Sequence, residues 1–241
     1  MGFNYRSVSY PAINKSINED SVGVFAISDG LLIIVCDGVN SALAGQLSVE
    51  SVYNFFRFST EPDYLIRIRE SIHSANNVIL NYPRTNIHYN GLATTADVLF
   101  LQDHNAYWGH IGDSRIYNMK NNNLHRITKD HSVIQKLVDE GFLTMNQAFN
   151  HPGKSAIFGA LGGGNEINID LSKMHLTNYD HHKFFVCTDG VSNIISEEKI
   201  ENTLRLRNID SITKELEKLI LACNPKDDFS FVVVEYSKRN N

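Results

Sequence analysis

Acidic residues stand at the ends of short apolar segments throughout the sequence. Two apolar runs, residues 32–36 and 184–188, each lead directly into an Asp-Gly pair, Asp37-Gly38 and Asp189-Gly190. Other acidic residues border strand-like runs in the same way, at Glu19-Asp20, Asp113 and Asp227-Asp228. A strand fixes the direction of its terminal residue better than a loop does, so several such ends can bring carboxylates from distant parts of the chain to one point.

Carboxylates that converge in this way indicate a metal site. Clustered carboxylates repel one another unless they are protonated or neutralised, and a divalent cation removes that cost. An oxygen-only ligand set favours Mg²⁺ or Mn²⁺ over zinc. Two such ions ~4 Å apart can share a carboxylate and generate hydroxide between them. Each Asp-Gly pair taken alone is also a simple turn signal. The number of such sites favours a hydrolytic metal centre, but their convergence does not follow from the sequence alone.

The segments that would position these acids are mostly short strands. Runs rich in β-branched and aromatic residues, bounded by Gly, Asp and Asn, predict strands at 22–27, 31–36, 93–101, 106–111, 115–119, 183–187 and 229–236. Ser28-Asp29-Gly30 is a hairpin signal, and Asn121-Asn122-Asn123 is a polar turn between two strands. Such tight connections predict antiparallel pairing.

Helical periodicity lies between the groups of strands. Apolar residues recur at helical spacing over 42–58, 65–80 and 211–222, and Ser196 is a candidate N-cap ahead of Glu197 and Glu198. Helices together with hairpin-linked strands predict an α+β fold, in which a β-sandwich is covered by helices on its outer faces. Residues 130–162 are rich in loop formers around a short helix at 133–140, and we expect an excursion from the main sheets there.

The composition is that of a globular protein. The 241 residues suit one large domain or two small ones, with 42% hydrophobic and 20% charged residues. A net charge of −5 argues against a nucleic-acid partner. Cys36, Cys187 and Cys223 give no disulfide or zinc pattern, and the first two are expected to be buried thiols. The longest apolar run, 31–36, is too short to span a membrane, so a cytoplasmic location is expected.

The same residues resemble the motifs of the type 2C metal-dependent protein phosphatases (the PPM family), especially the bacterial branch. The resemblance covers nearly the whole chain in the family's order. The matching segments are Lys15–Asp20, Val35–Gly38, Gly91–Thr95, His110–Tyr117, Ile127–Ser132, Val138–Gly141, Cys187–Gly190 and Asp227–Ser230.

This resemblance implies a fold and a set of metal ligands. The fold is a four-layer sandwich of two stacked antiparallel sheets flanked by helices, formed by residues 1–241 as a single phosphatase-like domain. Asp37 would bridge two Mn²⁺ or Mg²⁺ ions, with the Gly38 carbonyl as a further ligand, and Asp189 and Asp227 would complete the main site. Glu19 and Asp20 would hold metal-bound waters or ligate directly. Asp113 would help to hold a third, weaker ion.

The resemblance also implies a substrate-binding residue and a flap. A basic residue four positions before the Glu binds the substrate phosphate in the family, and here it is Lys15. Residues 130–162 would form the flap beside the active site. The chain departs from the family at Lys15, where Arg is usual and where Lys loses bidentate phosphate geometry. It departs also at Val39-Asn40-Ser41, which lacks two glycines, and at Asp228, which replaces Asn and adds a negative charge.

The sequence thus predicts a protein serine/threonine phosphatase in which a metal-bridging hydroxide attacks phosphorus and Asp37, Asp189 and Lys15 carry the reaction. Its partner would be a phosphorylated protein, in a signalling pathway that opposes a serine/threonine kinase, and it would act as a monomer without membrane or nucleic acid. Two other functions remain open: a phosphatase-like module that binds a phosphorylated partner without turnover, and a hydrolase of small phosphoesters.

Overall fold

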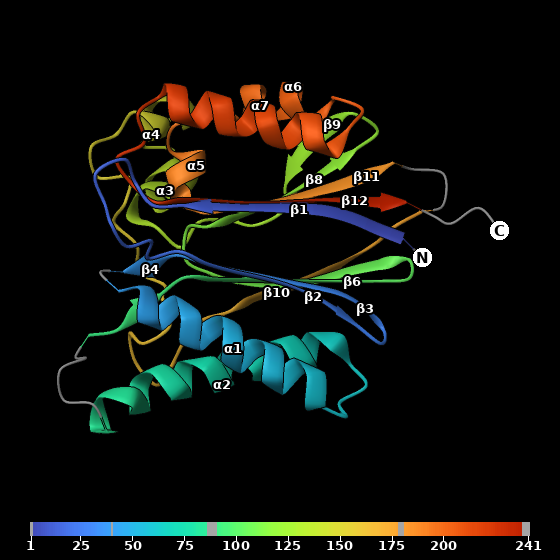
Figure 1. The fold of residues 1–241 in the computed structure, drawn as a ribbon. Coiled ribbons are helices and arrows are strands. Elements are labelled where there is room, and N and C mark those ends of the chain that lie inside the picture. Colours follow the sequence, from blue (N-terminus) through green and yellow to red (C-terminus); the bar gives the residue numbers. More distant parts are fainter. Residues whose placement is uncertain (1, 40, 86–90, 178–180, 238–241) are drawn as a thin grey trace.

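Two five-stranded antiparallel sheets lie face to face, and helices cover their outer surfaces (Figure 1). The computed structural model describes residues 2–39, 41–85, 91–177 and 181–237. In spatial order, the first sheet contains β1 (Gly2–Tyr10), β12 (Phe229–Ser237), β11 (His182–Cys187), β8 (Arg115–Lys120) and β9 (Asn123–Arg126). The second contains β10 (Asp170–His175), β7 (Asn105–Ile111), β6 (Ala96–Gln102), β3 (Gly30–Cys36) and β2 (Ser21–Ile27). The predicted α+β sandwich is confirmed.

The helices divide between the two sheets and one end of the sandwich. The second sheet is covered by α1 (Ala42–Phe58) and α2 (Tyr64–Thr85), and the first by α6 (Glu197–Leu204) and α7 (Ile209–Ala222). Three short helices lie at the left-hand end in Figure 1: α3 (Val133–Asp139), α4 (Met145–Phe149) and α5 (Asp189–Ser192). Ser196 caps α6 as predicted, since its hydroxyl oxygen accepts a hydrogen bond from the Lys199 amide.

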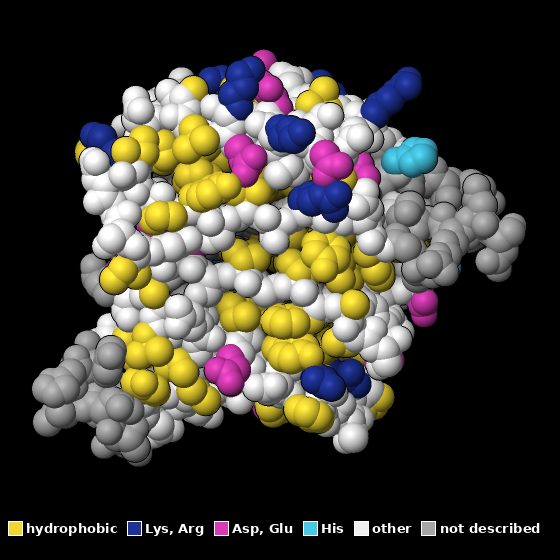
Figure 2. Space-filling view, in the orientation of Figure 1, with side chains coloured by type: hydrophobic (Ala, Val, Ile, Leu, Met, Phe, Trp, Pro, Cys, Tyr) yellow, Lys and Arg dark blue, Asp and Glu magenta, His cyan; other side chains and the backbone are white. Residues whose placement is uncertain are grey.

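Apolar side chains form three layers, one between the sheets and one beneath each pair of helices. Alternate residues of β3 serve different layers: Leu32 and Ile34 face the α1–α2 layer, whereas Ile33 faces the layer between the sheets. Because both faces of such a strand are buried, it appears in the sequence as a continuous apolar run. On the face drawn in Figure 2, apolar side chains are visible on both sides of the seam between the two sheets. In the part of the chain that the structure describes, no helix has the length and apolarity to cross a membrane.

The predicted strand at 93–101 is in fact two strands. Ala93–Thr94 (β5) pairs with Gly38–Val39 (β4) in a small separate sheet, and β6 begins only at Ala96. The intervening Thr95 binds the backbone of Asp37 instead of continuing a ladder, since its amide donates to the Asp37 carbonyl oxygen over 2.9 Å. Periodicity does not show such a break, because no glycine or proline marks it in the sequence.

The β2–β3 hairpin is confirmed, but its glycine has another role than turning the chain. Ile27 pairs with Gly30, so the two turn residues are Ser28 and Asp29. A Cβ atom on Gly30 would overlap with the backbone carbonyl oxygen of Leu101 on the neighbouring strand β6. Gly30 is therefore required for close approach of the two strands.

Gly30→Ala is expected to lower the free energy of unfolding by about 2 kcal/mol, because the extra methyl group forces two buried strands apart. Urea denaturation of the metal-free protein measures the change. Gly164→Ala is the matched control: no heavy atom lies within 4 Å of a Cβ placed there, and the change should stay within about 0.5 kcal/mol. Equal effects of the two substitutions would contradict the close-approach explanation.

Candidate active site

The register of the strands brings the acidic positions to one end of the sandwich. Asp20 precedes β2 and Asp37 follows β3, and these strands pair Ser21 with Cys36. In the first sheet, Cys187 pairs with Phe231, so the end of β11 lies beside the start of β12. Asp189, Asp227 and Asp228 occupy those two ends, and Asp113 follows β7 two residues after its last strand residue, Ile111. Both sheets therefore contribute acids to the same end of the sandwich.

The acids are close enough to disturb one another's ionisation. Burial raises the pKa of Asp37 well above its usual range, and repulsion from Asp189, Asp20 and Asp113 adds to this. Burial also raises the pKa of Asp189, and the interaction between the Asp37 and Asp189 carboxyl groups raises the pKa of Asp37 further while it opposes the rise for Asp189. Burial is the main cause of the raised pKa of Asp113 as well, followed by the charge of Asp189.

Asp20 is held by hydroxyl groups from the opposite sheet. The Thr188 hydroxyl group donates to the Asp20 carboxylate over 2.9 Å. Burial nevertheless raises the pKa of Asp20 to about 7, since the hydrogen bonds from Ser230 and Thr188 only partly offset burial and the charges of Asp189 and Asp228. A buried carboxyl group with so high a pKa lacks a cationic partner of its own.

The donor chemistry of this cluster fits a divalent cation. Oδ2 of Asp189 accepts a hydrogen bond from the Asn193 side chain over 2.8 Å, whereas Oδ1 is buried with no hydrogen-bond donor among the described residues. A buried carboxylate oxygen without a donor, surrounded by other carboxylates, is suited to a hard cation with oxygen ligands. Within the described ranges, no three His, Cys, Asp or Glu side chains already surround a single ion position. The fit therefore rests on charge, burial and the unpaired oxygen.

Glycines and threonines set the backbone beside the acids. A Cβ atom on Gly38 would overlap with the Glu19 carbonyl oxygen, and one on Gly190 with the Asp228 carbonyl oxygen. Both Asp-Gly pairs therefore allow a close backbone approach. The Asp37 amide donates to the Thr95 hydroxyl oxygen over 2.9 Å, and the Thr94 hydroxyl group donates to the Asp37 carbonyl oxygen over 2.8 Å. Residue chemistry alone gave these threonines no role, because their contact crosses more than fifty residues.

Lys15 and Asp228 form a connected pair. The Lys15 ammonium group donates to Glu19 over 2.9 Å, to Asp228 over 3.2 Å and to Asp227 over 3.4 Å. Burial opposes the charged form of Lys15, but the hydrogen bonds to Glu19 and Asp228 outweigh it and raise the pKa. Asp228 is only 2% exposed, and its carboxylate also accepts from the Ala12 and Glu19 amides, each over 2.7 Å.

Asp228 therefore differs from the added charge that the sequence predicts. Two backbone amides and one ammonium group compensate its carboxylate, which ties the segment between Ala12 and Glu19 to the start of β12. Asp227 is the more open of the two, with a side chain that is 60% exposed. A satisfied, buried carboxylate of this kind stabilises a loop, although its charge also adds to the raised pKa of Asp20.

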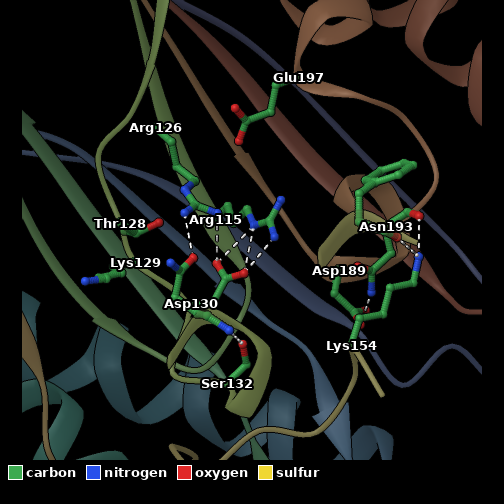
Figure 3. Close-up of polar contacts among 12 residues, drawn as sticks. Arg115, Arg126, Thr128, Lys129, Asp130, Ser132, Lys154, Asp189, Asn193 and Glu197 are labelled. Carbon is green, nitrogen blue, oxygen red and sulfur yellow. Dashed lines mark hydrogen bonds and ion pairs between the residues drawn. The ribbon is translucent and has the colours of Figure 1, made fainter. Parts of the chain in front are cut away.

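The segment 130–162 is bound to the acidic end of the sandwich at two places (Figure 3). Asp130 accepts from Arg115 Nε over 3.0 Å and from Nη2 over 2.6 Å. On the other side, the Lys154 ammonium group donates to the Asn193 carbonyl oxygen over 2.7 Å, and the Asn193 side chain in turn contacts Asp189. The segment includes α3 and α4 and lies next to Asp113 and Asp189.

Comparison with known proteins identifies the class. The family model described as Protein phosphatase 2C matches residues 12–227, from the loop that carries Lys15 to Asp227. The chain belongs to this family. Its relatives place it in the bacterial branch: it is 26% identical over 230 residues to the serine/threonine phosphatase stp of Listeria welshimeri, covering 90% of each chain.

Two solved structures are similar over nearly their whole length. The Mycobacterium tuberculosis serine/threonine phosphatase PstP/Ppp is 27% identical, with a TM-score of 0.87 over 98% of this chain and 99% of the other. The catalytic domain of PstP in complex with two manganese ions is 26% identical, with a TM-score of 0.84 over 97% of each chain.

Proposed function

We propose that this chain hydrolyses phosphoserine and phosphothreonine on proteins with the help of two or three Mn²⁺ or Mg²⁺ ions. Membership of the family and the manganese complex of PstP support the reaction class. The observation that carries the proposal is the unpaired, buried Oδ1 of Asp189 among carboxylates from both sheets. Bound ions supply positive charge for the phosphoryl oxygens and an activated water as the nucleophile.

The residues of the acidic end take separate roles in this proposal. Asp37 and the Gly38 carbonyl would hold the shared ligand position, and Asp189 and Asp227 would complete the main site. Glu19 and Asp20 would orient metal-bound waters or ligate directly, and Asp113 would serve a third ion. The Asp37 backbone is fixed by Thr94 and Thr95, so its carboxylate is positioned before any ion binds.

Lys15 would bind the substrate phosphate. It lies on a loop that Asp228 tethers, and its raised pKa keeps the ammonium group charged. An ammonium group presents a point charge to a phosphate, without the bidentate geometry of a guanidinium group. Since Lys15 already contacts Glu19 and Asp227, it lies beside the residues assigned to the ions.

Lys15→Ala is expected to raise KM for a phosphothreonine peptide at least about tenfold, because a charged hydrogen bond to the phosphate is lost. Steady-state kinetics at saturating manganese measure KM and kcat separately. Lys218→Ala, at an exposed lysine of α7 that forms an ion pair with Glu215 at 3.4 Å, is the control and should match the wild type. An unchanged KM in Lys15→Ala would remove Lys15 from the phosphate site.

The departure from the family's pattern at residues 39–41 does not favour a binding module without turnover. Ser41 caps α1 by accepting a hydrogen bond from the Leu43 amide over 3.2 Å, and Asn40 lies outside the described residues. A residue that caps a helix has a structural reason to replace glycine.

Phosphate release from a phosphothreonine peptide, with and without manganese, tests the proposal directly. Manganese-dependent turnover supports the phosphatase, and peptide binding without turnover would support the module instead. Preference for small phosphoesters over every peptide tested would support the third function.

The wider setting belongs to the same proposal. We infer a single domain over residues 1–241, with the flap at about 130–162, because acids of both sheets are needed at one end. Cys36 and Cys187 are free and buried, which fits a reducing, cytoplasmic location. Phosphoprotein substrates would place the chain in signalling, as a monomer opposing a serine/threonine kinase.

A further inference from the structure

A cavity of about 260 Å³ lies between the flap helices α3 and α4 and the segment that carries α5 and α6. It opens beside Asp113 and Asp189, so it is continuous with the proposed reaction centre. We call it the flap cavity. Its volume is below the ~300–1,000 Å³ of pockets that enclose a whole small molecule, and it suits a single side chain.

One wall of the flap cavity is apolar. It is formed by side chains of the two flap helices: Ile134, Val138, Met145, Ala148 and Phe149. Met145 is half-exposed, so part of its side chain is free to contact a guest. Such a wall gains free energy when an apolar group covers it.

The wall is already ordered. Thr144 and Gln147 form a reciprocal capping box at the start of α4, and Ser132 caps α3. The Lys154 ammonium group lies 5.2 Å from the centre of the Phe149 ring and donates to the Phe149 carbonyl oxygen over 3.2 Å. These contacts hold the helices in place, so a guest need not order them.

Several polar side chains around the flap cavity are already paired within the protein, whereas Asp189 Oδ1 and Ser192 Oγ are buried without a hydrogen-bond partner among the described residues. Arg115 is bound to Asp130, and Arg126 Nη2 donates to Gln135 over 2.8 Å (Figure 3). An apolar guest that covers the wall formed by the flap helices therefore displaces none of the hydrogen bonds of Arg115 or Arg126.

From this arrangement we propose that the flap cavity receives an apolar side chain of the substrate, from a residue next to the phosphorylated one. The inference rests on the proposed function and adds a substrate preference to it. Asp189 lines both the cavity and the acidic cluster, and consecutive Cα atoms are about 3.8 Å apart. A phosphothreonine at the acids thus places its neighbouring side chain at the mouth of the cavity.

The test uses pairs of phosphothreonine peptides that differ only by Leu or Ser, either directly before or directly after the phosphorylated residue. Wild-type kcat/KM should favour Leu at least about tenfold in one pair, which corresponds to about 1.4 kcal/mol. Ala148→Trp fills the cavity and should bring that ratio close to one. Met145→Ser makes the wall polar and should lower the ratio about threefold.

The ratio is measured within one preparation, so loss of folded protein affects both peptides equally. Ala222→Trp, the same change at an exposed residue of α7, should keep the wild-type ratio. Equal turnover of Leu and Ser peptides by the wild type, or an unchanged ratio in Ala148→Trp, overturns the inference.

Binding of fluorescein-labelled peptides, followed by anisotropy with manganese present, gives the same ratio without turnover. If no peptide is hydrolysed yet Leu is preferred in binding and Ala148→Trp removes the preference, the cavity assignment holds and the proposed reaction fails. If the peptides are hydrolysed but neither assay shows a preference for Leu, the proposed reaction holds and the cavity assignment fails.

Discussion

Asp189→Ala is expected to lower kcat/KM for a phosphothreonine peptide by at least about 10³-fold. Bound ions stabilise the transition state by several kcal/mol, and each 1.4 kcal/mol is a factor of ten in rate. Asp189 is the acid whose charge raises the pKa of Asp37, Asp20 and Asp113, so it lies at the centre of the cluster. Its removal takes away the unpaired oxygen on which the cation site depends.

Manganese titrations of activity and of thermal stability measure this effect in two independent ways. Asp189→Ala should lose both the activity and most of the manganese-dependent rise in Tm. Asp210→Ala is the matched control, since Asp210 forms an exposed ion pair with Arg6 at 2.7 Å and is not one of the proposed metal ligands. Retention of full manganese-dependent turnover by Asp189→Ala would end the assignment of the metal centre.

Metal-free protein is expected to become less stable as the pH rises from about 4 to about 7. The pKa of Asp20 is about 7 in the folded chain, because burial disfavours its charged form, and about 3.9 in an unfolded chain. Between these values the folded state binds more protons than the unfolded state. The stability that Asp20 contributes is therefore fully present below pH 4 and is lost as the pH rises towards 7. The loss from Asp20 is on the order of 3 kcal/mol.

Urea unfolding at pH 5.0 and pH 7.5, with EDTA or with manganese, measures this dependence. Manganese should restore stability mainly at pH 7.5, because carboxylates must be deprotonated to bind an ion. Asp20→Asn should make the dependence in EDTA shallower, since an amide does not titrate, while the raised pKa values of Asp37, Asp113 and Asp189 maintain the rest of it. The same slope in Asp20→Asn and wild type would show that other groups cause it.

The sequence predicts the parts of this site that are local. Each Asp after an apolar run marks a strand end. These strands are buried on both faces, so they appear in the sequence as runs of Val, Ile and Phe. The buried thiols Cys36 and Cys187 follow from the same runs. Edge strands are harder: β1 runs from Gly2 to Tyr10, and several of its side chains are exposed, so it lacks that signal.

The parts that the sequence does not predict depend on contacts between remote residues. The sequence predicts Thr95 as a strand residue, whereas in the structure its hydroxyl oxygen accepts from the Asp37 amide. It predicts Asp228 as an extra charge, whereas in the structure the carboxylate accepts from the Ala12 and Glu19 amides. Both roles come from hydrogen bonds between residues that are far apart in the sequence. Residue type alone cannot separate such a tether from a repulsive charge.

The two sheets each contribute only part of the acidic end. Asp37 follows a strand of one sheet, and Asp189 follows a strand of the other, with Leu99 and Phe184 packed in the layer between them. An ion shared by these two acids would act as a cross-link between the halves of the sandwich. Substitutions that change side-chain volume in the layer between the sheets, even far from the acids, would then alter ion affinity. Selection on the interior of this protein is therefore also selection on its chemistry.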